Sequence, residues 1–310
     1  MKAKSKVRRI SGDAKAVGRA VTRALRRPST YPGALKEMFS TGLNIALFPA
    51  GLIGEAVGAE PTNGALRGRF SPQLALRYLD PNAASTPIIL VHGYFHNRSA
   101  FVMMRRALRR AGYHNVECFN YNVIGHTVDE LAQNLKSYID NILECTGAEK
   151  VHLVGHSLGG LIARTYVQQY GGDETVHTCV TLGTPHAGTY AAFVGRGKAA
   201  KELRPASELI KRLDATARPS AVRWVSYYSN LDALIVPATS AKLTHPAFNA
   251  TNILIKDLGH MSLLISSPLM HSIAVSLSQI ATPEQPEPAT VSALKPAKPA
   301  RARKRKADTA

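Results

Sequence analysis

The sequence is short of cysteine, and it lacks the apolar core of an export signal. Its three cysteines, Cys118, Cys145 and Cys179, form no Cys-x-x-Cys pair, and an odd number cannot all pair within one chain. We therefore expect unpaired, unreactive thiols rather than a disulfide framework. The first 30 residues are basic throughout, so we expect no cleavable secretory peptide.

Acidic side chains are also scarce, with 21 Asp and Glu against 39 Lys and Arg and a net charge of +18. Residues 1–30 carry ten basic and one acidic side chain, and residues 281–310 carry seven and three. Residues 31–280 carry twenty-two and seventeen. The two ends hold +13 of the net charge, so they are expected to attract an anionic partner, whereas the middle is not.

Between residues 61 and 280, short apolar runs alternate with stretches of helical periodicity. We expect strands at 88–91, 116–121, 151–154, 176–182, 222–228 and 252–255. Helices are expected between most of them, one opened by a capping box at Thr127 and Glu130 and closed by Gly147. This alternation predicts an α/β domain with a mostly parallel, doubly wound sheet flanked by helices.

One serine lies between an expected strand and an expected helix, in the segment Gly155-His156-Ser157-Leu158-Gly159-Gly160. A Gly-x-Ser-x-Gly at such a junction is typical of a nucleophile elbow, a sharp turn that only small neighbours permit. The pattern predicts that the Ser157 hydroxyl lies at the carboxyl end of the sheet. The helix start there favours developing negative charge.

A serine hydroxyl needs a histidine, itself held by a carboxylate, before it becomes an effective nucleophile. In enzymes with this elbow, the acid and then the base follow the serine along the chain. His260 lies in a loop after the expected strand 252–255, so we predict that it is the base. His177 falls in a strand and His271 in the last helix, which favours structural roles for both.

Three aspartates are candidates for the acid. Asp232 follows the strand 222–228 and is the first choice, because its position places it at a carboxyl end of the sheet. Asp257 is the second choice and Asp214 the third. For the oxyanion hole, the N–H of Leu158 and the N–H of Tyr94, in the loop after the first strand, are the candidate donors.

Five segments occur in a characteristic order: Val91-His92-Gly93, the serine segment, Thr181-Leu182-Gly183-Thr184-Pro185-His186-x-Gly188, Asp232-x-x-x-Val236-Pro237 and Gly259-His260. In order and spacing they resemble the α/β-hydrolase superfamily, specifically its bacterial triacylglycerol lipase and esterase branch. The resemblance covers roughly residues 85–280.

This resemblance implies an α/β-hydrolase fold with Ser157 as nucleophile, Asp232 as acid and His260 as base, and with Tyr94 and Leu158 as oxyanion donors. Secreted lipases of the branch often carry a calcium site and a disulfide, and we locate neither. We expect no cofactor and no metal ion. Residues 187–220 form an insert that fits either a lid over an acyl pocket or packed surface helices.

Residues 1–60 predict a basic arm followed by a hydrophobic, membrane-associating segment. Its core, residues 38–54, has no charged side chain, but its seventeen residues include Pro49 and fall short of the roughly 18 needed to span a bilayer. We favour an interfacial or re-entrant segment. A kinked single span and burial against the catalytic domain are the alternatives. A cytoplasmic or inner-membrane-associated location follows.

Residues 281–310, rich in Pro, Ala, Lys and Arg, cannot bury a core, and we expect them to be disordered. Such a tail binds nucleic acid, polyphosphate or anionic lipid without sequence preference, or it only aids solubility. It has no interleaved aromatic residue on which bases could stack, which argues against specific nucleic-acid binding.

These features predict a serine ester hydrolase that acts on acyl-chain substrates through an acyl-enzyme intermediate. A thioesterase, an acyltransferase or an intracellular polyester depolymerase could use the same triad and is the alternative. A non-catalytic protein that binds membranes or polyanions on a hydrolase scaffold is a second alternative.

Overall fold

The structure is a computed structural model that describes residues 30–52 and 81–279 of the 310-residue chain. The basic arm up to residue 29, the C-terminal tail and residues 53–80 lie outside the described residues. All three cysteines are within them and none is in a disulfide.

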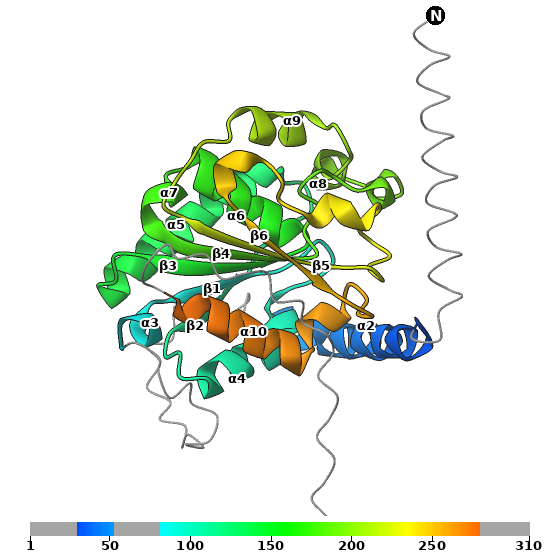
Figure 1. The fold of residues 1–310 in the computed structure, drawn as a ribbon, viewed down its shortest axis with the longest axis horizontal. Helices are drawn as coiled ribbons and strands as arrows, with labels where there is room; N and C mark the ends of the chain where they lie inside the picture. The colour runs from blue at the N-terminus through cyan, green and yellow to red at the C-terminus, as the bar shows by residue number, and fades with distance from the viewer. Residues whose placement is uncertain (1–29, 53–80, 280–310) are drawn as a thin grey trace, which may run out of the picture.

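A six-stranded sheet forms the centre of the molecule (Figure 1). Its strand order is β2-β1-β3-β4-β5-β6, and every neighbouring pair is parallel. The chain order reverses between β1 and β3, which is where open α/β sheets place their sites. The strands are β1 (Ile88–Val91), β2 (Val116–Phe119), β3 (Val151–His156), β4 (Val176–Leu182), β5 (Arg223–Ser229) and β6 (Thr251–Ile255).

Helices cover both faces of the sheet (Figure 1). On one face, α5 (Val128–Thr146) and α6 (Leu158–Gln169) bury their apolar stripes in one core cluster. On the other face, α4 (Val102–Arg110) and α10 (Ser267–Ser278) form a second cluster. The expected capping box of Thr127 and Glu130 is present at the start of α5, and Gly147 ends that helix with φ +67°. Short helices α3 (Pro81–Ser85) and α7 (Gly172–Thr175) complete the layers.

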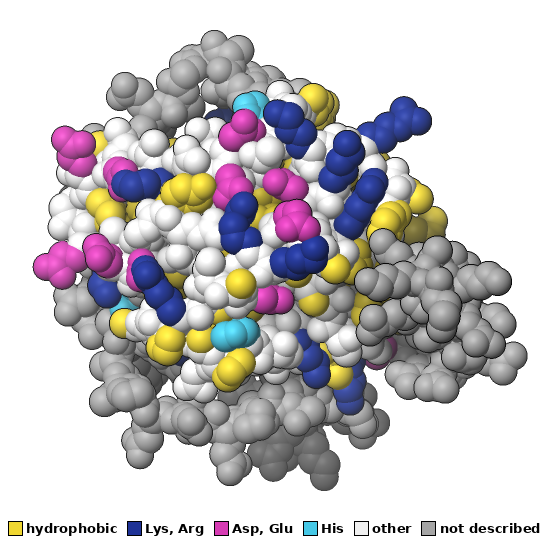
Figure 2. Space-filling view, turned by 90° about the horizontal axis from the view of Figure 1, so that it is seen from above, with side chains coloured by type: hydrophobic (Ala, Val, Ile, Leu, Met, Phe, Trp, Pro, Cys, Tyr) yellow, Lys and Arg dark blue, Asp and Glu magenta, His cyan; other side chains and the backbone are white. Residues whose placement is uncertain are grey.

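The insert after β4 contains η2 (Tyr190–Phe193), α8 (Lys198–Glu202) and α9 (Glu208–Ala215). Ala199 of α8 and the large apolar side chains of α9 are buried in the same cluster as α5 and α6, whereas Phe193 and Val194, at the end of η2, are exposed. Figure 2 shows the face that carries α9, on which basic and acidic side chains are intermingled. The described surface carries exposed ion pairs between such side chains, among them Arg212 with Asp129 and Arg218 with Asp173.

Helix α2 (Thr30–Leu52) contains most of the hydrophobic segment and is the blue helix of Figure 1. It lies against η1 (Arg98–Phe101) and η5 (Ser262–Leu264), so one of its faces packs on the domain. Its other face exposes large apolar side chains that are 67–72% accessible, namely Leu35, Met38, Phe39 and Ile45. Within residues 30–52 and 81–279, no helix combines the length and apolar character needed to cross a membrane.

Helix α6 approaches β1 so closely that only glycine fits between them. An ideal Cβ on Gly159 would lie 2.1 Å from the carbonyl oxygen of Val91, and one on Gly160 would lie 1.9 Å from Oγ1 of Thr184. Real Cβ atoms essentially never lie this close to atoms to which they are not bonded. The two glycines therefore set the distance between the start of α6 and the ends of β1 and β4.

Replacing Gly159 with Ala is expected to lower the free energy of unfolding by about 1–3 kcal/mol or more, because α6 must move away from β1. Urea denaturation followed by circular dichroism measures the loss. Gly42→Ala is the matched control, since Gly42 is also helical and has no described atom within 4 Å. It should be neutral or stabilising by up to about 1 kcal/mol. Equal stability of the two variants would contradict the packing constraint.

Candidate active site

Ser157 occupies the turn between β3 and α6 in a conformation that side chains rarely adopt. Its φ and ψ are 56° and −123°. The backbone N–H of Ser157 donates to the carbonyl of Leu182 at 2.9 Å, which ties the turn to the end of β4. The side chain is half-buried. This backbone is the strained strand-to-helix turn that the Gly-x-Ser-x-Gly pattern predicts.

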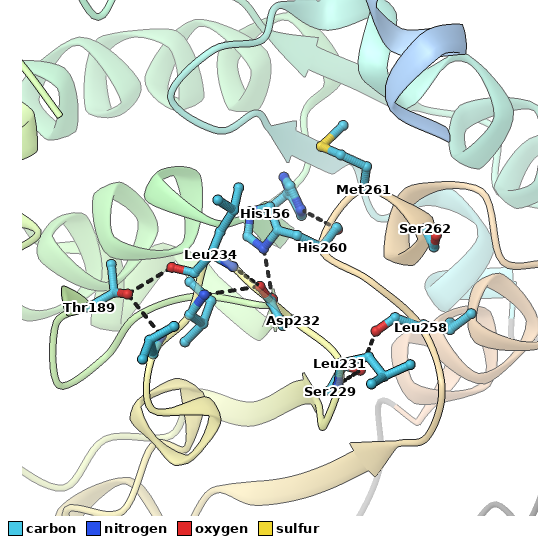
Figure 3. Close-up of polar contacts among 12 residues, drawn as sticks. His156, Thr189, Ser229, Leu231, Asp232, Leu234, Leu258, His260, Met261 and Ser262 are labelled. Carbon is cyan, nitrogen blue, oxygen red and sulfur yellow. Dashed lines mark hydrogen bonds and ion pairs between the residues drawn. The ribbon is translucent and has the colours of Figure 1, made fainter. Parts of the chain in front are cut away.

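Asp232 and His260 meet in the buried space beside this turn (Figure 3). Nδ1 of His260 lies 2.7 Å from Oδ2 of Asp232. The other carboxylate oxygen of Asp232 accepts the backbone N–H groups of Leu234 and Ile235, both at 3.0 Å. Since both oxygens are engaged, the carboxylate is fixed in orientation and holds the imidazole through Nδ1.

Further hydrogen bonds hold the loops that carry this pair (Figure 3). The hydroxyl of Ser229, the last residue of β5, donates to the carbonyl of Leu258 in the loop after β6. Oγ1 of Thr189 donates to the carbonyl of Leu234 at 2.7 Å and accepts the N–H of Val236 at 2.9 Å. The acid loop is thus joined both to the histidine loop and to the segment after β4.

His156 connects the histidine loop to the serine turn. Its ring centroid lies 4.5 Å from that of His260, and its Nε2 lies 3.2 Å from the carbonyl oxygen of His260. His156 immediately precedes Ser157, so this contact places His260 beside the elbow. Gly183 adjoins both residues of the pair, because an ideal Cβ there would lie 2.8 Å from Oδ2 of Asp232 and 3.2 Å from Nδ1 of His260.

The two expected oxyanion donors belong to segments that adjoin Ser157. An ideal Cβ on Gly93 would lie 3.0 Å from Cβ of Ser157, so the loop after β1 lies directly against the elbow. Tyr94 follows Gly93 in that loop, and its hydroxyl donates to the carbonyl of Arg196 in the insert. Leu158 is the first residue of α6, where backbone N–H groups have no partner within the helix.

Burial by itself lowers the pKa of His260, but the charge of Asp232 and its hydrogen bond raise it, and Glu37 adds to this effect. The net result is a pKa above the ordinary 6.5. Burial lowers the pKa of neighbouring His96 to about 4 and puts that of His156 well below 6.5. At neutral pH these two rings are uncharged, so neither of them opposes protonation of His260.

The structure places the second and third choices for the acid in other surroundings. The N–H of Asp257 donates to Oδ1 of Asn230 at 2.9 Å, and the residue has a φ of +61° in the turn before the histidine loop. Asp214 lies on α9 and pairs with the buried guanidinium of Arg164 at 2.8 Å. Of the three candidates, the structure brings only Asp232 to His260.

Two other histidines, His177 and His92, have local partners, and a third, His271, is exposed. Nδ1 of His177, on β4, lies 2.9 Å from Oγ1 of Thr178, and His271 is exposed on α10. The ring of His92 bonds the carbonyl of Gly93 through Nδ1 at 2.9 Å, which stiffens the loop after β1. Within the described residues, no group of three or more His, Cys, Asp or Glu is arranged to hold a metal ion.

A family model described as the alpha/beta hydrolase fold matches residues 86–198. A triacylglycerol lipase from Burkholderia plantarii is 32% identical over 150 residues, which are 45% of this chain and 41% of that protein. The structure of mature Bacillus licheniformis lipase BlEst2 has a TM-score of 0.53 at 18% identity, covering 65% of this chain and 94% of that one. This chain has the α/β-hydrolase fold.

A second triacylglycerol lipase, from Pseudarthrobacter phenanthrenivorans, is 34% identical over 122 residues, which are 36% of this chain and 37% of that protein. This chain is also 27% identical to lysosomal thioesterase PPT2-B from Xenopus laevis over 121 residues, which are 38% of this chain and 42% of that protein. The chain spans less than half the length of these curated relatives. The predicted α/β-hydrolase fold, with its parallel sheet flanked by helices, is confirmed.

Two residues of this α/β hydrolase adjoin the site in roles that the sequence did not reveal. Gly183 belongs to the Gly-Thr-Pro-His segment, which the sequence analysis identified. Its φ of +52° and its close approach to Asp232 are seen only in the structure. Glu37 of α2 binds the two residues after His260. No sequence signal connects it with the site, because 224 positions separate it from Met261.

The raised pKa of His260 can be measured by ¹H–¹⁵N spectra of the histidine rings. We expect its ring to titrate above 6.5, because a nearby carboxylate favours the cation more than burial disfavours it. Replacing Asp232 with Asn removes the charge but keeps the burial, so the pKa should fall below 6.5. Asp173→Asn, which removes a surface carboxylate paired with Arg218, is the control and should leave the His260 titration unchanged. Titration of His260 below 6.5 in the unaltered chain would refute this assignment.

Proposed function

We propose that this α/β hydrolase is a serine ester hydrolase that cleaves acyl esters with Ser157, His260 and Asp232. The observation that carries the proposal is the buried hydrogen bond between Asp232 and His260, which lies beside a strained serine turn. The named relatives, a triacylglycerol lipase among them, support an ester as the substrate.

In the proposed mechanism, Oγ of Ser157 attacks the ester carbonyl carbon while Nε2 of His260 takes the hydroxyl proton. Asp232 keeps Nδ1 protonated and stabilises the imidazolium that forms. The N–H groups of Leu158 and Tyr94 stabilise the negative oxygen of the tetrahedral intermediate. The C–O bond to the alcohol then breaks, and His260 returns the proton to the leaving alkoxide.

The resulting acyl-enzyme is hydrolysed by the same groups in a second round. His260, neutral again, takes a proton from water, and the water oxygen attacks the acyl carbon. The bond to Oγ of Ser157 breaks, the serine regains its proton from His260, and the carboxylic acid leaves. The base must be neutral in both rounds, so activity should rise with pH through the raised pKa of His260.

A thioester is the second candidate substrate, and the similarity to a lysosomal thioesterase favours it. The same attack and the same oxyanion donors serve a thioester carbonyl, with a thiolate as the leaving group. Comparing p-nitrophenyl acyl esters with acyl thioesters of equal chain length distinguishes the two substrates. An acyltransferase or a polyester depolymerase would instead be recognised by its preference for an alcohol acceptor or a polymer.

Replacing Ser157 with Ala should abolish hydrolysis of p-nitrophenyl acyl esters and labelling by a fluorophosphonate probe, because the nucleophile is lost. The loss in kcat should be about 10⁴-fold or greater. Ser137→Ala is the control, since Ser137 is exposed on α5, and it should behave like the unaltered chain. Retained esterase activity in purified, folded Ser157→Ala would eliminate Ser157 as the nucleophile. Absence of both activity and labelling in the unaltered chain would favour a non-catalytic scaffold.

We also propose that the protein attaches to an anionic lipid surface. The chain ends carry most of the net positive charge, and the outer face of α2, which follows the basic N-terminal arm, presents exposed Met38 and Phe39. Basic residues are attracted to anionic headgroups, and apolar side chains enter the acyl boundary.

Flotation with anionic vesicles should recover the protein at low salt, and deletion of residues 1–29 and 281–310 should reduce recovery. High salt should mimic the deletion, because it screens the charges. Replacing both Met38 and Phe39 with Ser should weaken the binding that persists at high salt. Neutral vesicles are the control for the charge-dependent part. Equal recovery of all variants on anionic vesicles would exclude this attachment.

A further inference from the structure

The face of α2 that packs on the domain is polar, the reverse of the usual surface helix. Four residues on that face lie inward, at spacings of four, three and four, which a helix aligns on one side: Gly33, Glu37, Ser40 and Asn44. A polar stripe that packs on a domain requires hydrogen-bonding partners there. The identity of those partners indicates what the helix does.

The side chain of Glu37 meets the histidine loop with both carboxylate oxygens. Oε1 accepts the backbone N–H of Met261 at 2.8 Å. Oε2 accepts the backbone N–H of Ser262 and the Ser262 hydroxyl, both at 2.8 Å. Met261 and Ser262 directly follow His260. Charge-assisted bonds of this kind are stronger and shorter than neutral ones, so Glu37 fixes the backbone on the C-terminal side of the histidine.

Close packing holds the same loop on its other side. An ideal Cβ on Gly259 would lie 2.4 Å from Cδ of Glu37, so the residue before His260 leaves room only for this carboxylate. Gly33, one turn earlier on α2, would place a Cβ 2.9 Å from the carbonyl oxygen of Asp257 and 2.8 Å from Cδ1 of Leu231. Helix α2 thus contacts both the histidine loop and the residue before Asp232.

The far half of α2 is tied to the loop after β1. Nδ2 of Asn97 donates to the carbonyl of Phe48 at 2.8 Å, and Oδ1 of Asn97 accepts the N–H of Ser99 at the start of η1. One rigid helix therefore bonds to two of the loops that form the site.

We propose that Glu37 is a positioning residue for His260 and that α2, by way of this carboxylate, is a required part of the active site. The proposal rests on the proposed function, in which His260 is the base. Glu37 touches neither substrate nor nucleophile. It acts by holding the loop of His260 at the angle that lets the ring bridge Asp232 and Ser157.

The charge of Glu37 has a second effect that a purely structural contact would lack. The groups that face His260 are Asp232 from the loop after β5, Glu37 from α2, His156 from β3 and His96 from the loop after β1. The two rings are neutral near pH 7, so the carboxylates supply the charge around His260. Removing the Glu37 charge should therefore lower the pKa of His260 and move the acid limb of the pH–rate profile to lower pH.

The test compares the full chain with Glu37→Gln and Glu37→Ala in hydrolysis of a short p-nitrophenyl ester. Gln keeps the volume but presents an N–H₂ group to a backbone N–H, so one of the bonds is lost. We expect kcat to fall about 10- to 100-fold with little change in KM, since a misplaced base slows the chemical step more than binding. The midpoint of the acid limb should shift downward in both variants.

Glu130→Gln is the matched control. Glu130 also accepts a backbone N–H, that of Thr127 at 2.7 Å, but it does so in the capping box of α5. This variant should keep the kcat and the pH profile of the unaltered chain. Melting temperatures of all variants show whether lost activity reflects lost folding. Ser262→Ala removes only the hydroxyl donor, so it should lower kcat less than Glu37→Gln does. If Glu37→Gln does not fold, Ser262→Ala tests the same contact in its place.

Folded Glu37→Gln with the kcat and acid limb of the unaltered chain would overturn the proposal. So would a loss of kcat that leaves the acid limb in place, because that result would make Glu37 a structural contact alone. If the unaltered chain cleaves no ester and its Ser157 does not react with a fluorophosphonate, the proposed function fails instead. In that case, the ring titration of His260 in Glu37→Gln still tests whether Glu37 acts on His260. An unchanged pKa of His260 would contradict that action.

Discussion

The site depends on how closely the turn after β3 packs between the ends of β1 and β4. Gly159 and Gly160 allow α6 to touch the carbonyl of Val91 and the side chain of Thr184, and no larger residue would fit. This approach forces Ser157 into a positive φ and holds its N–H on the carbonyl of Leu182. The serine is therefore placed by backbone packing, and its position does not rely on hydrogen bonds of its own side chain.

The segment Gly183-Thr184-Pro185-His186 shows how a motif known only by resemblance acquires a physical role. Thr184 fills the space that Gly160 leaves, and Nε2 of His186 lies 3.0 Å from Oγ1 of Thr181. The carbonyl of His186 accepts a hydrogen bond from the buried Arg164 at 3.0 Å. Because Arg164 also pairs with Asp214, this segment links the elbow helix to the insert.

The sequence was most informative where a local pattern has a local cause. The apolar runs correspond to the six strands within a few residues, and the capping box at Thr127 begins α5 as its spacing predicts. The order of serine, acid and base selected Asp232 and His260, which lie 2.7 Å apart. The strands and the helix cap share a cause, since each is encoded by residues that are close together in the chain, whereas the catalytic roles of Asp232 and His260 stay predictions.

The role of α2 could not be predicted in this way. Residues 38–54 read as an uncharged hydrophobic stretch, and the side of the helix that would face the domain depends on partners more than 200 positions away. Helical amphipathicity assigns the apolar face to the core, whereas here Ser40 and Asn44 face inward and Phe39 faces outward. Only the fold reveals that the inner polar stripe accepts hydrogen bonds from the N–H groups of the two residues after His260.

Two carboxylates near one buried imidazole also explain why His260 differs from its neighbours. His96 and His156 lie in similar surroundings, but the groups that act on them are other histidines, so burial dominates and they stay neutral. For His260 the carboxylate of Asp232 reverses the effect of burial, and Glu37 contributes in the same direction from a separate element. The imidazolium formed during catalysis would thus be stabilised from both sides. Glu37 belongs to α2, whose outer face is apolar. A lipid surface that binds this face would therefore contact the same helix that holds the loop of His260.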